Sequence, residues 1–480
     1  MSNYWAVKRP LPFIVILLAF CSLAVGYVFS TPYRTEGRLI FQQGSSKDIG
    51  APDERQHANY VKRLMEGKGL PVLDPQDPEL YENYQAHQPP LYYFLAAGFS
   101  IVTGADPTDP QSGAKLRFLS VILGMATLAG IYFLVKWADG RDEVAWAAMT
   151  LGLMPMFLGL NSAVSNDPLL YAAIAWSSAL AVKAMKQGGS WRDMAVLGLV
   201  VAAAFASKTT SLALIPVLLT ALTLTWRHDK GQKIVIGGGL LLALILASPV
   251  WLRNMNLYGD PFALRVFQAS FTGSAQASTF IESIGAIGYW TQWVAWWTVR
   301  SLIGVFGYMD IYLFETLGQA KFNQIYLALA FLFGIILALG LVPGRKDPSD
   351  QDEEEEPTPR AMWPLAVLGI VVLLLFAQFN RTYFQGQGRY LYPAIPLLSL
   401  LWGRGLVFAF KGRPGAWIAG VVVLGGLSAL FLSQLPQSFK VRADTSSPEV
   451  SQRYNLPSNG SSSGELSLLL AQARHEVPGG

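Results

Sequence analysis

The 480-residue sequence has a single cysteine, four histidines and few charged residues. Cys21 alone excludes an internal disulfide and a cysteine-based metal site. Charged residues make up 14% of the chain and the formal net charge is +4, which gives no basis for nucleic-acid binding. No internal repeat is evident. The chain is instead rich in hydrophobic residues, 52% of the total, a share typical of membrane proteins.

Apolar runs bounded by basic loops predict an all-α polytopic membrane protein. The first run follows Lys8 and Arg9, is long for a signal peptide and lacks a small-residue cleavage site, so we interpret it as an uncleaved span. Basic residues mark cytoplasmic loops, which predicts a plasma-membrane protein (bacterial inner membrane) with a cytoplasmic N-terminus and an extracytoplasmic C-terminus. About eleven spans are predicted, over residues 11–29, 116–136, 143–160, 168–185, two short spans between 192 and 227, 233–252, 322–342, 361–379, 390–409 and 414–432.

Long polar segments interrupt these spans. The first outer loop is predicted to carry juxtamembrane helices, including Pro89–Thr103, which is shorter than the roughly 20 residues needed to cross and should lie in the membrane interface. A Trp-rich stretch at 289–297 predicts a second interfacial helix. The predicted segments are the bundle domain 1–432, with its first outer loop 30–115, second outer loop 254–320 and acidic cytoplasmic linker 343–360, and a flexible extracytoplasmic tail 433–480.

Ionisable residues converge on the predicted outer face. At membrane depth such groups cost roughly 3 kcal/mol each, so we interpret them as functional. Acids lie in the first loop and basic residues lie at the ends of later spans. Carboxylates suit activation of a hydroxyl, and Arg and Lys suit a phosphate. The candidate site residues are Asp53, Glu54, His57, Glu82, His87, Asp167, Lys208, Arg253, Arg381, Arg389 and Tyr390.

Several candidates also have an ordinary structural interpretation. Asp53 and Glu54 could form the first turn of a helix, where acids are favourable. Asp167 could cap a helix. Lys208 could extend along apolar surface to reach water, and Arg389 could anchor a span at the interface.

The first loop also contains candidate metal ligands. Glu54, His57 and His87 could hold a divalent cation, although their spacing is not diagnostic of a metal site. No other cofactor is predicted from the sequence.

Five short motifs occur in a characteristic order. They are Asp53-Glu54 after the first span, His87–Tyr93, Asn166-Asp167, Lys208 in a short hairpin, and Trp251–Asn254 running into Tyr258–Pro261. With the hydropathy pattern, this order resembles the GT-C superfamily of membrane glycosyltransferases. The resemblance is nearest to the branch containing protein O-mannosyltransferases and lipid A aminoarabinose transferases, with their uncharacterised bacterial homologues.

The resemblance implies a GT-C-like bundle that transfers a sugar from a polyprenyl-phosphate donor to a glycan, lipid or protein acceptor, among membrane lipids. Asp53 would be the general base and Glu54 its acidic companion. A polyprenyl phosphate leaves without a general acid but needs charge stabilisation. One base and in-line attack predict inversion at the anomeric carbon. The inferred phosphate contacts are Lys208, Arg253, Arg381 and Arg389.

Two other classes of function remain open. A transporter would place polar residues near the midplane on broken helices, often in repeated halves; here they lie at span ends and in a long loop. A non-catalytic subunit of the same fold, binding a lipid or glycan, would share every feature except turnover.

Overall fold

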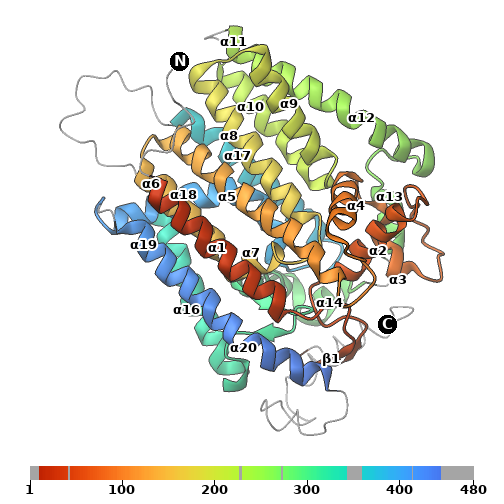
Figure 1. Cartoon of the computed structure of the whole chain (residues 1–480). Helices are drawn as coiled ribbons and strands as arrows, with labels where there is room; N and C mark the ends of the chain where they lie inside the picture. Colours follow the sequence, from red (N-terminus) through yellow and green to blue (C-terminus); the bar gives the residue numbers. More distant parts are fainter. Residues whose placement is uncertain are drawn as a thin grey trace.

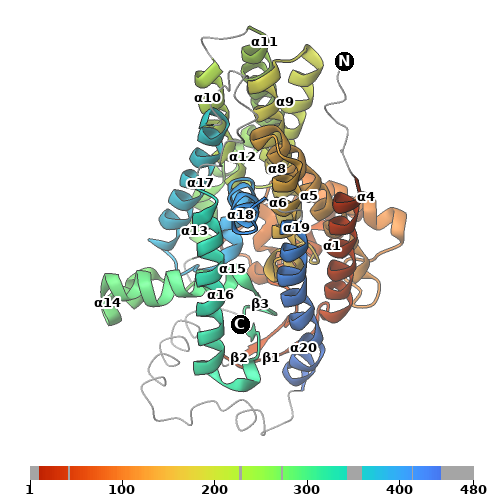
Figure 2. The ribbon, with the colours of Figure 1, turned by 90° about the vertical axis from the view of Figure 1, so that its left-hand side faces the viewer.

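A computed structural model describes residues 10–41, 44–225, 230–271, 274–342, 359–412 and 415–444. Long helices run side by side in one bundle, and the shorter helices of two outer segments gather toward one end (Figures 1 and 2). The segment 343–358, most of the predicted acidic linker, lies outside the described residues. The bundle helices are α1 (Pro10–Ser30), α5 (Arg117–Asp139), α6 (Asp142–Met149), α7 (Pro155–Leu160), α8 (Asp167–Gln187), α9 (Trp191–Phe205), α10 (Leu214–Thr225), α11 (Lys230–Lys233), α12 (Gly239–Tyr258), α16 (Gln319–Leu339), α17 (Pro359–Asn380), α18 (Ile395–Ala409), α19 (Ala416–Gly420) and α20 (Gly426–Ala443).

Each predicted span coincides with helical structure. Eight helices in the described ranges are long and apolar enough to cross a membrane. The two short spans predicted between 192 and 227 correspond to α9 and α10, and the span predicted over 143–160 corresponds to α6 and α7. The prediction of a helical, multi-pass membrane protein is therefore confirmed, apart from two short two-stranded sheets in the outer loops that it did not include, while the number eleven stays a prediction.

The segment of α6 and α7 is broken at its centre. α6 ends at Met149, a 3₁₀ turn covers Thr150–Leu153, and Met154 is extended (φ −58°, ψ 131°). The residue before a proline is disfavoured in the helical conformation, so Pro155 starts a new helix. Every residue from 144 to 158 is buried. Neighbouring helices therefore cover the break, as a non-helical backbone within a membrane requires.

Glycines allow α18 to lie directly against two neighbours. A Cβ atom at Gly405 would lie 1.8 Å from the carbonyl oxygen of Ile336 in α16, and one at Gly403 would lie 2.5 Å from that of Val144 in α6. Close packing of this kind holds helices together in a membrane, where lipid tails are as apolar as the side chains. α18 is consequently fixed at the centre of the bundle.

The first outer loop contains three helices and a small antiparallel sheet. α2 and α4 pack together, and the rings of Tyr60 and Tyr93 stack with centroids 3.7 Å apart. The opposite face of α4 exposes Ile101 and Val102. Such a face suits the predicted position in the membrane interface, which stays a prediction. The elements are β1 (Gly37–Leu39), β2 (Gly44–Ser46), α2 (Glu54–Met65), α3 (Leu80–Asn83), α4 (Leu91–Thr103) and 3₁₀ turns at Tyr84–His87 and Gly113–Leu116.

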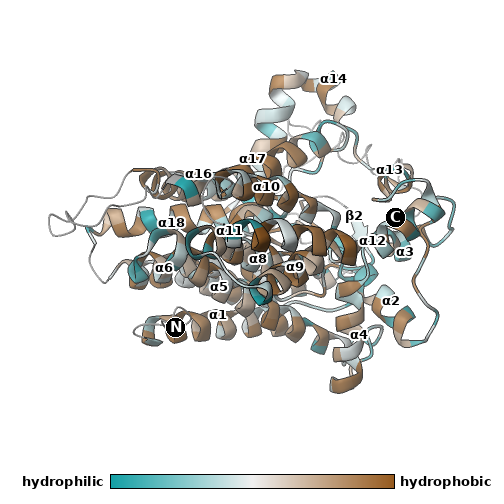
Figure 3. Ribbon diagram, turned by 90° about the horizontal axis from the view of Figure 1, so that it is seen from above, coloured by the Kyte–Doolittle hydropathy of each residue, from teal (hydrophilic) through white to brown (hydrophobic). Residues whose placement is uncertain are grey.

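The second outer loop leads from α12 to α16. Its helix α14 projects beyond the mainly hydrophobic bundle (Figure 3) and lies across the direction of α16 (Figure 2). The predicted Trp-rich helix is present, as a π-helical turn followed by α15. The elements are α13 (Leu264–Ser270), α14 (Ala277–Gly288), a π-helical turn (Tyr289–Ala295), α15 (Trp296–Ile303), β3 (Val305–Phe306), β4 (Ile311–Tyr312) and a 3₁₀ turn (Glu315–Leu317).

The last helix is longer than the sequence predicts. α20 continues through Ala443, whereas the flexible tail was expected to begin at residue 433. Near its end the buried Arg442 makes ion pairs with Asp310 (2.8 Å) and Glu315 (3.0 Å). A buried charge requires such partners, and these come from the second outer loop, so the composition of the tail could not reveal the contact.

Arg442→Met should lower the thermal midpoint of the purified protein in detergent. Removing one partner of a buried ion pair leaves the others uncompensated, at a cost of about 3–5 kcal/mol. Lys440→Met changes an exposed residue of the same helix and serves as the control. Unfolding is measured by tryptophan fluorescence. Equal thermal midpoints for the two variants would contradict the anchoring of α20 by Arg442.

Cysteines at the two ends of the bundle test the predicted orientation. Gln187 ends α8 near α11, where Gln232 Nε2 donates to the Met185 carbonyl (2.7 Å), and α20 ends at the opposite side (Figure 2). In a Cys21→Ser background, an impermeant maleimide should label Ala443→Cys in intact cells and Gln187→Cys only after permeabilisation. Labelling of both in intact cells would reject the topology.

Candidate active site

A cavity of about 1190 Å³ lies among the first outer loop, the second outer loop and the ends of several bundle helices. One wall is polar; it consists of the first loop, the start of α8, the turn before α10 and the loop after α17. A second wall comes mainly from α13 and α17 and is apolar; the ring of its Phe267 contacts that of His87, with centroids 4.6 Å apart. Its residues are Phe262, Leu264, Phe267, Phe271, Val372, Leu375, Phe376 and Phe379. The cavity therefore offers a charged and an apolar surface to one ligand.

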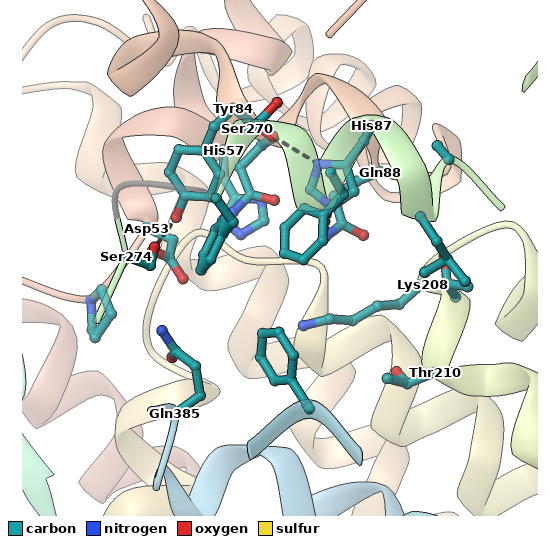
Figure 4. A pocket seen from close by; sticks show the side chains of 18 of the residues that line it. Asp53, His57, Tyr84, His87, Gln88, Lys208, Thr210, Ser270, Ser274 and Gln385 are labelled. Carbon is teal, nitrogen blue, oxygen red and sulfur yellow. Dashed lines mark hydrogen bonds between the residues drawn. The ribbon is translucent and has the colours of Figure 1, made fainter. Parts of the chain in front are cut away.

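Asp53 lies on the polar wall, at the residue before α2. Its backbone is left-handed (φ 63°), a conformation that Asp tolerates better than most residues. The side chain does not cap α2. One carboxylate oxygen instead accepts a hydrogen bond from the Tyr84 hydroxyl, and the other lies 2.7 Å from Arg389 Nη2. The helix-start interpretation thus explains the position of Asp53 but not the direction of its side chain, which faces the cavity (Figure 4).

The surroundings of Asp53 keep it ionised. Burial alone would favour the neutral acid, but the Arg389 guanidinium and the Tyr84 hydroxyl stabilise the carboxylate and hold the pKa of Asp53 below its usual range. Burial and the charge of Asp53 raise the pKa of Tyr84 well above its usual value, so Tyr84 remains a proton donor. Asp53 is therefore a carboxylate at neutral pH.

Both histidines of the first loop line the cavity, and both are neutral. His57 Nδ1 lies 2.8 Å from the Tyr93 hydroxyl, and His87 Nδ1 donates to the Tyr84 carbonyl oxygen (2.7 Å). Burial lowers the pKa of His57 to about 3 and that of His87 to about 4. Neither imidazole therefore carries charge for an ionic ligand.

A second ion pair lies on the same wall. α8 begins at Asp167, whose carboxylate is 2.5 Å from Lys208 Nζ at the turn before α10. The Asn166 amide holds this turn by donating to the Ser207 carbonyl (2.9 Å) and to Gln88 Oε1 (3.2 Å). The Lys208 side chain extends into the cavity (Figure 4). Because Lys208 is partly buried and pairs with Asp167, it does not reach along apolar surface to water.

Two further candidates line the cavity. Glu82 accepts hydrogen bonds from Arg55 Nε (2.8 and 2.9 Å) and from the Asn59 amide (2.8 Å). The Tyr390 hydroxyl accepts a hydrogen bond from Arg389 Nη2 (3.3 Å). Arg55 and Asn59 therefore hold Glu82 in place, whereas Tyr390 orients the arginine that binds Asp53.

The structure does not bring three of the selected residues into the cavity. Glu54 makes an ion pair of 2.6 Å with Arg117, and neither side chain is exposed. Arg253, at the end of α12, donates to the Pro71 carbonyl (2.7 Å). Arg381 is exposed at the end of α17. These three residues therefore do not line the cavity.

The three candidate metal ligands do not fit a shared metal site. In the described part of the chain, no three His, Cys, Asp or Glu side chains are grouped closely enough to hold a metal ion. Glu54 is committed to Arg117, and His57 and His87 each use Nδ1 in a hydrogen bond. We therefore assign no step to a metal.

Several cavity residues were not selected from the sequence, namely Tyr84, Gln88, Tyr308, Gln385 and Gln387. Apart from Tyr390, the predicted site residues have ionisable acidic, basic or imidazole side chains, whereas these five have amide or phenol groups. Gln88 lies within the motif His87–Tyr93, and the signal for Gln385 and Gln387 was the alternation of glutamine and glycine directly before Arg389.

Comparison with known proteins agrees with this architecture. Residues 87–252 match the family described as dolichyl-phosphate-mannose-protein mannosyltransferase. The matched range includes His87, Asp167 and Lys208, and leaves out Asp53 and Arg389. With the fold, this match confirms the expected resemblance to the GT-C superfamily of membrane glycosyltransferases. No curated protein sequence matches the chain.

Solved structures with a similar fold include the Archaeoglobus fulgidus oligosaccharyltransferase. Its complex with zinc and sulfate has a TM-score of 0.51 and 14% identity, over 92% of this chain and 57% of that one. Its form tethered to an acceptor peptide has a TM-score of 0.50 and 14% identity, over 94% and 59%. ArnT from Cupriavidus metallidurans, bound to undecaprenyl phosphate, has a TM-score of 0.49 and 14% identity, over 98% and 78%. The chain therefore spans little more than half the length of the oligosaccharyltransferase, and at this identity the likeness concerns the fold alone.

Proposed function

We propose that this protein is a membrane glycosyltransferase that moves a sugar from a polyprenyl-phosphate donor to an acceptor hydroxyl at the outer face of the membrane. The observation that carries the proposal is the ionised Asp53, held by Arg389 and Tyr84 in a cavity with one apolar wall. The matched family, described by a dolichyl-phosphate-mannose donor, supports the same class of substrate.

The apolar wall suits a prenyl chain. α17 contributes Phe376 and Phe379 to the cavity, and α13 contributes Phe267 and Phe271. Aromatic and aliphatic side chains of this kind gain free energy in proportion to the apolar area removed from water. A lipid chain between α13 and α17 would leave its phosphate at the polar wall.

Lys208 and Arg389 suit the phosphate. Both are partly buried and paired with a carboxylate, and each keeps further N–H donors, so a phosphate can bind beside the pair without displacing the carboxylate. Arg389 Nε is buried and has no hydrogen-bond partner among the described residues, which leaves a donor for an incoming oxygen. Fixed cations of this kind stabilise the charge that develops on a leaving phosphate.

Asp53 suits the base. A carboxylate offers about four lone-pair positions, and the contacts with Tyr84 and Arg389 occupy one on each oxygen. The remaining positions can accept a hydrogen bond from the hydroxyl group that receives the sugar. The oxygen of this hydroxyl then forms a bond to the anomeric carbon. The bond from that carbon to the phosphate oxygen breaks, the electron pair leaves with the phosphate, and the proton passes to Asp53. A single displacement inverts the anomeric configuration.

Asp53→Asn should reduce the rate of sugar release from a labelled polyprenyl-phosphate hexose by about 10²–10⁴-fold, because an amide cannot take up the proton. The rate of sugar release is divided by the amount of donor lipid that each variant binds. A loss of folding or of donor binding then does not lower the value. Asp167→Asn is the matched control, since it breaks the other carboxylate–cation pair of the cavity without removing the proposed base. Its rate per bound donor should fall much less. Similar losses in both variants would remove Asp53 as the base.

Lys208→Ala should weaken the binding of polyprenyl phosphate about 10- to 100-fold, the effect of losing one charge-assisted contact. Lys47→Ala removes the same charge at the exposed rim of the cavity and should leave the affinity unchanged. Binding is measured by microscale thermophoresis in detergent. Unchanged affinity in Lys208→Ala would exclude a phosphate contact there.

A further inference from the structure

The loop between α17 and Arg389 follows a two-residue period. Residues 385–388 read Gln-Gly-Gln-Gly, and Gln387 is extended (φ −110°, ψ 127°). Before it, the chain turns tightly around Gly386, where the Gln387 amide donates to the Gln385 carbonyl oxygen (2.7 Å). A Cβ atom on Gly388 would lie 2.3 Å from the backbone nitrogen of Leu302 in α15. Only glycine fits at position 388, and the side chains of Gln385 and Gln387 line the cavity.

Hydrogen bonds hold this loop at both ends. The Gly388 amide donates to Ser301 Oγ (2.7 Å), and the Gln385 amide donates to Asn380 Oδ1 (2.9 Å). The glutamine side chains therefore extend from a fixed backbone, as the recognition of a small ligand requires.

The two amide groups are only partly satisfied by each other. Gln387 Nε2 donates to Gln385 Oε1 (3.0 Å), and Gln387 Oε1 is then buried with no partner among the described residues. The Gln385 amide nitrogen points across the cavity toward Asp53 (Figure 4). A buried polar atom without a partner is unfavourable, and the pair leaves one acceptor and one donor for a ligand with hydroxyl groups.

The position of the amides matches the sugar end of the proposed donor. The Tyr390 hydroxyl links the amides to Arg389: it accepts a hydrogen bond from Arg389 Nη2 (3.3 Å) and donates one to Gln385 Oε1 (3.5 Å). A group linked to a phosphate at Arg389 would thus reach the amides. The inner carboxylates, Asp53 and Asp167, are already ion-paired. A charged substituent on the sugar would therefore meet neutral amides and carboxylates that already have cationic partners.

We infer that Gln385 and Gln387 form the sugar subsite of this cavity, and that the subsite selects an uncharged, hydroxyl-rich sugar over an amino sugar or a sugar acid. The inference rests on the proposed function and names the substrate class within it. Amides donate to one hydroxyl and accept from its neighbour, and they offer no charge to neutralise an ammonium or a carboxylate.

The test compares three lipids of one chain length: a prenyl phosphate, its hexose conjugate and its aminohexose conjugate. The wild-type protein should bind the hexose conjugate about tenfold more tightly than the other two, the combined effect of one or two neutral hydrogen bonds. Gln387→Leu should abolish this margin and keep the affinity for prenyl phosphate. Gln76→Leu, at the exposed rim of the cavity, should retain the margin.

Gln387→Glu supplies a gain of function that misfolding cannot imitate. Its new carboxylate should move the preference about tenfold toward the aminohexose conjugate. A margin that survives in Gln387→Leu, or a wild-type protein without a margin, would overturn the subsite while leaving the proposed function intact. Failure of the wild-type protein to bind prenyl phosphate at all would overturn the proposed function and the subsite with it.

Discussion

The buried ion pair of Glu54 and Arg117 determines how the first outer loop sits on the bundle. Arg117 offers five N–H donors, and all five are used: two bind the Glu54 carboxylate, two bind the carbonyls of Val28 and Thr31, and one binds the carbonyl of Pro32. Glu54 in turn accepts the backbone amide of residue 164 (2.8 Å). One contact therefore joins α1, α2, α5 and the chain before α8. Removing either charge would leave the other buried without a partner, which is why the loop has one position.

The cavity follows from this constraint. Asp53 precedes Glu54 directly, so the anchoring of one acid directs the other toward Arg389. Every other polar residue of the wall comes from the end of a helix or from a loop beside one, where a charged group need not cross the apolar interior. The apolar wall comes from the sides of α13 and α17. The bundle thus brings a charged surface and an apolar one together from segments that are far apart in the sequence.

Hydropathy located the helices of the bundle because a crossing segment must be long and apolar. It could not reveal the break before Pro155, which lies in an unbroken apolar run. Charge located Asp53, Lys208 and Arg389, which the structure brings to one cavity. It could not separate Asp53 from Glu54, since the choice depends on Arg117 in a distant segment. Selection by charge also gave Arg253 and Arg381, which do not line the cavity. Packing determines in which direction a helix end turns its side chains, and the sequence does not show this. Neutral glutamines gave no signal of this kind.

The apolar wall between α13 and α17 has a consequence for kinetics. α17 also exposes large aliphatic side chains on its surface, including Leu373 and Leu374. A ligand with a prenyl chain would dissolve in the bilayer before it reached this wall, and would return there on release. Its encounters with the protein would take place in two dimensions. Occupancy of the cavity would then depend on the mole fraction of the ligand among the surrounding lipids. Adding inert lipid to the membrane would lower the rate of binding even if the amount of ligand per volume of sample stayed constant.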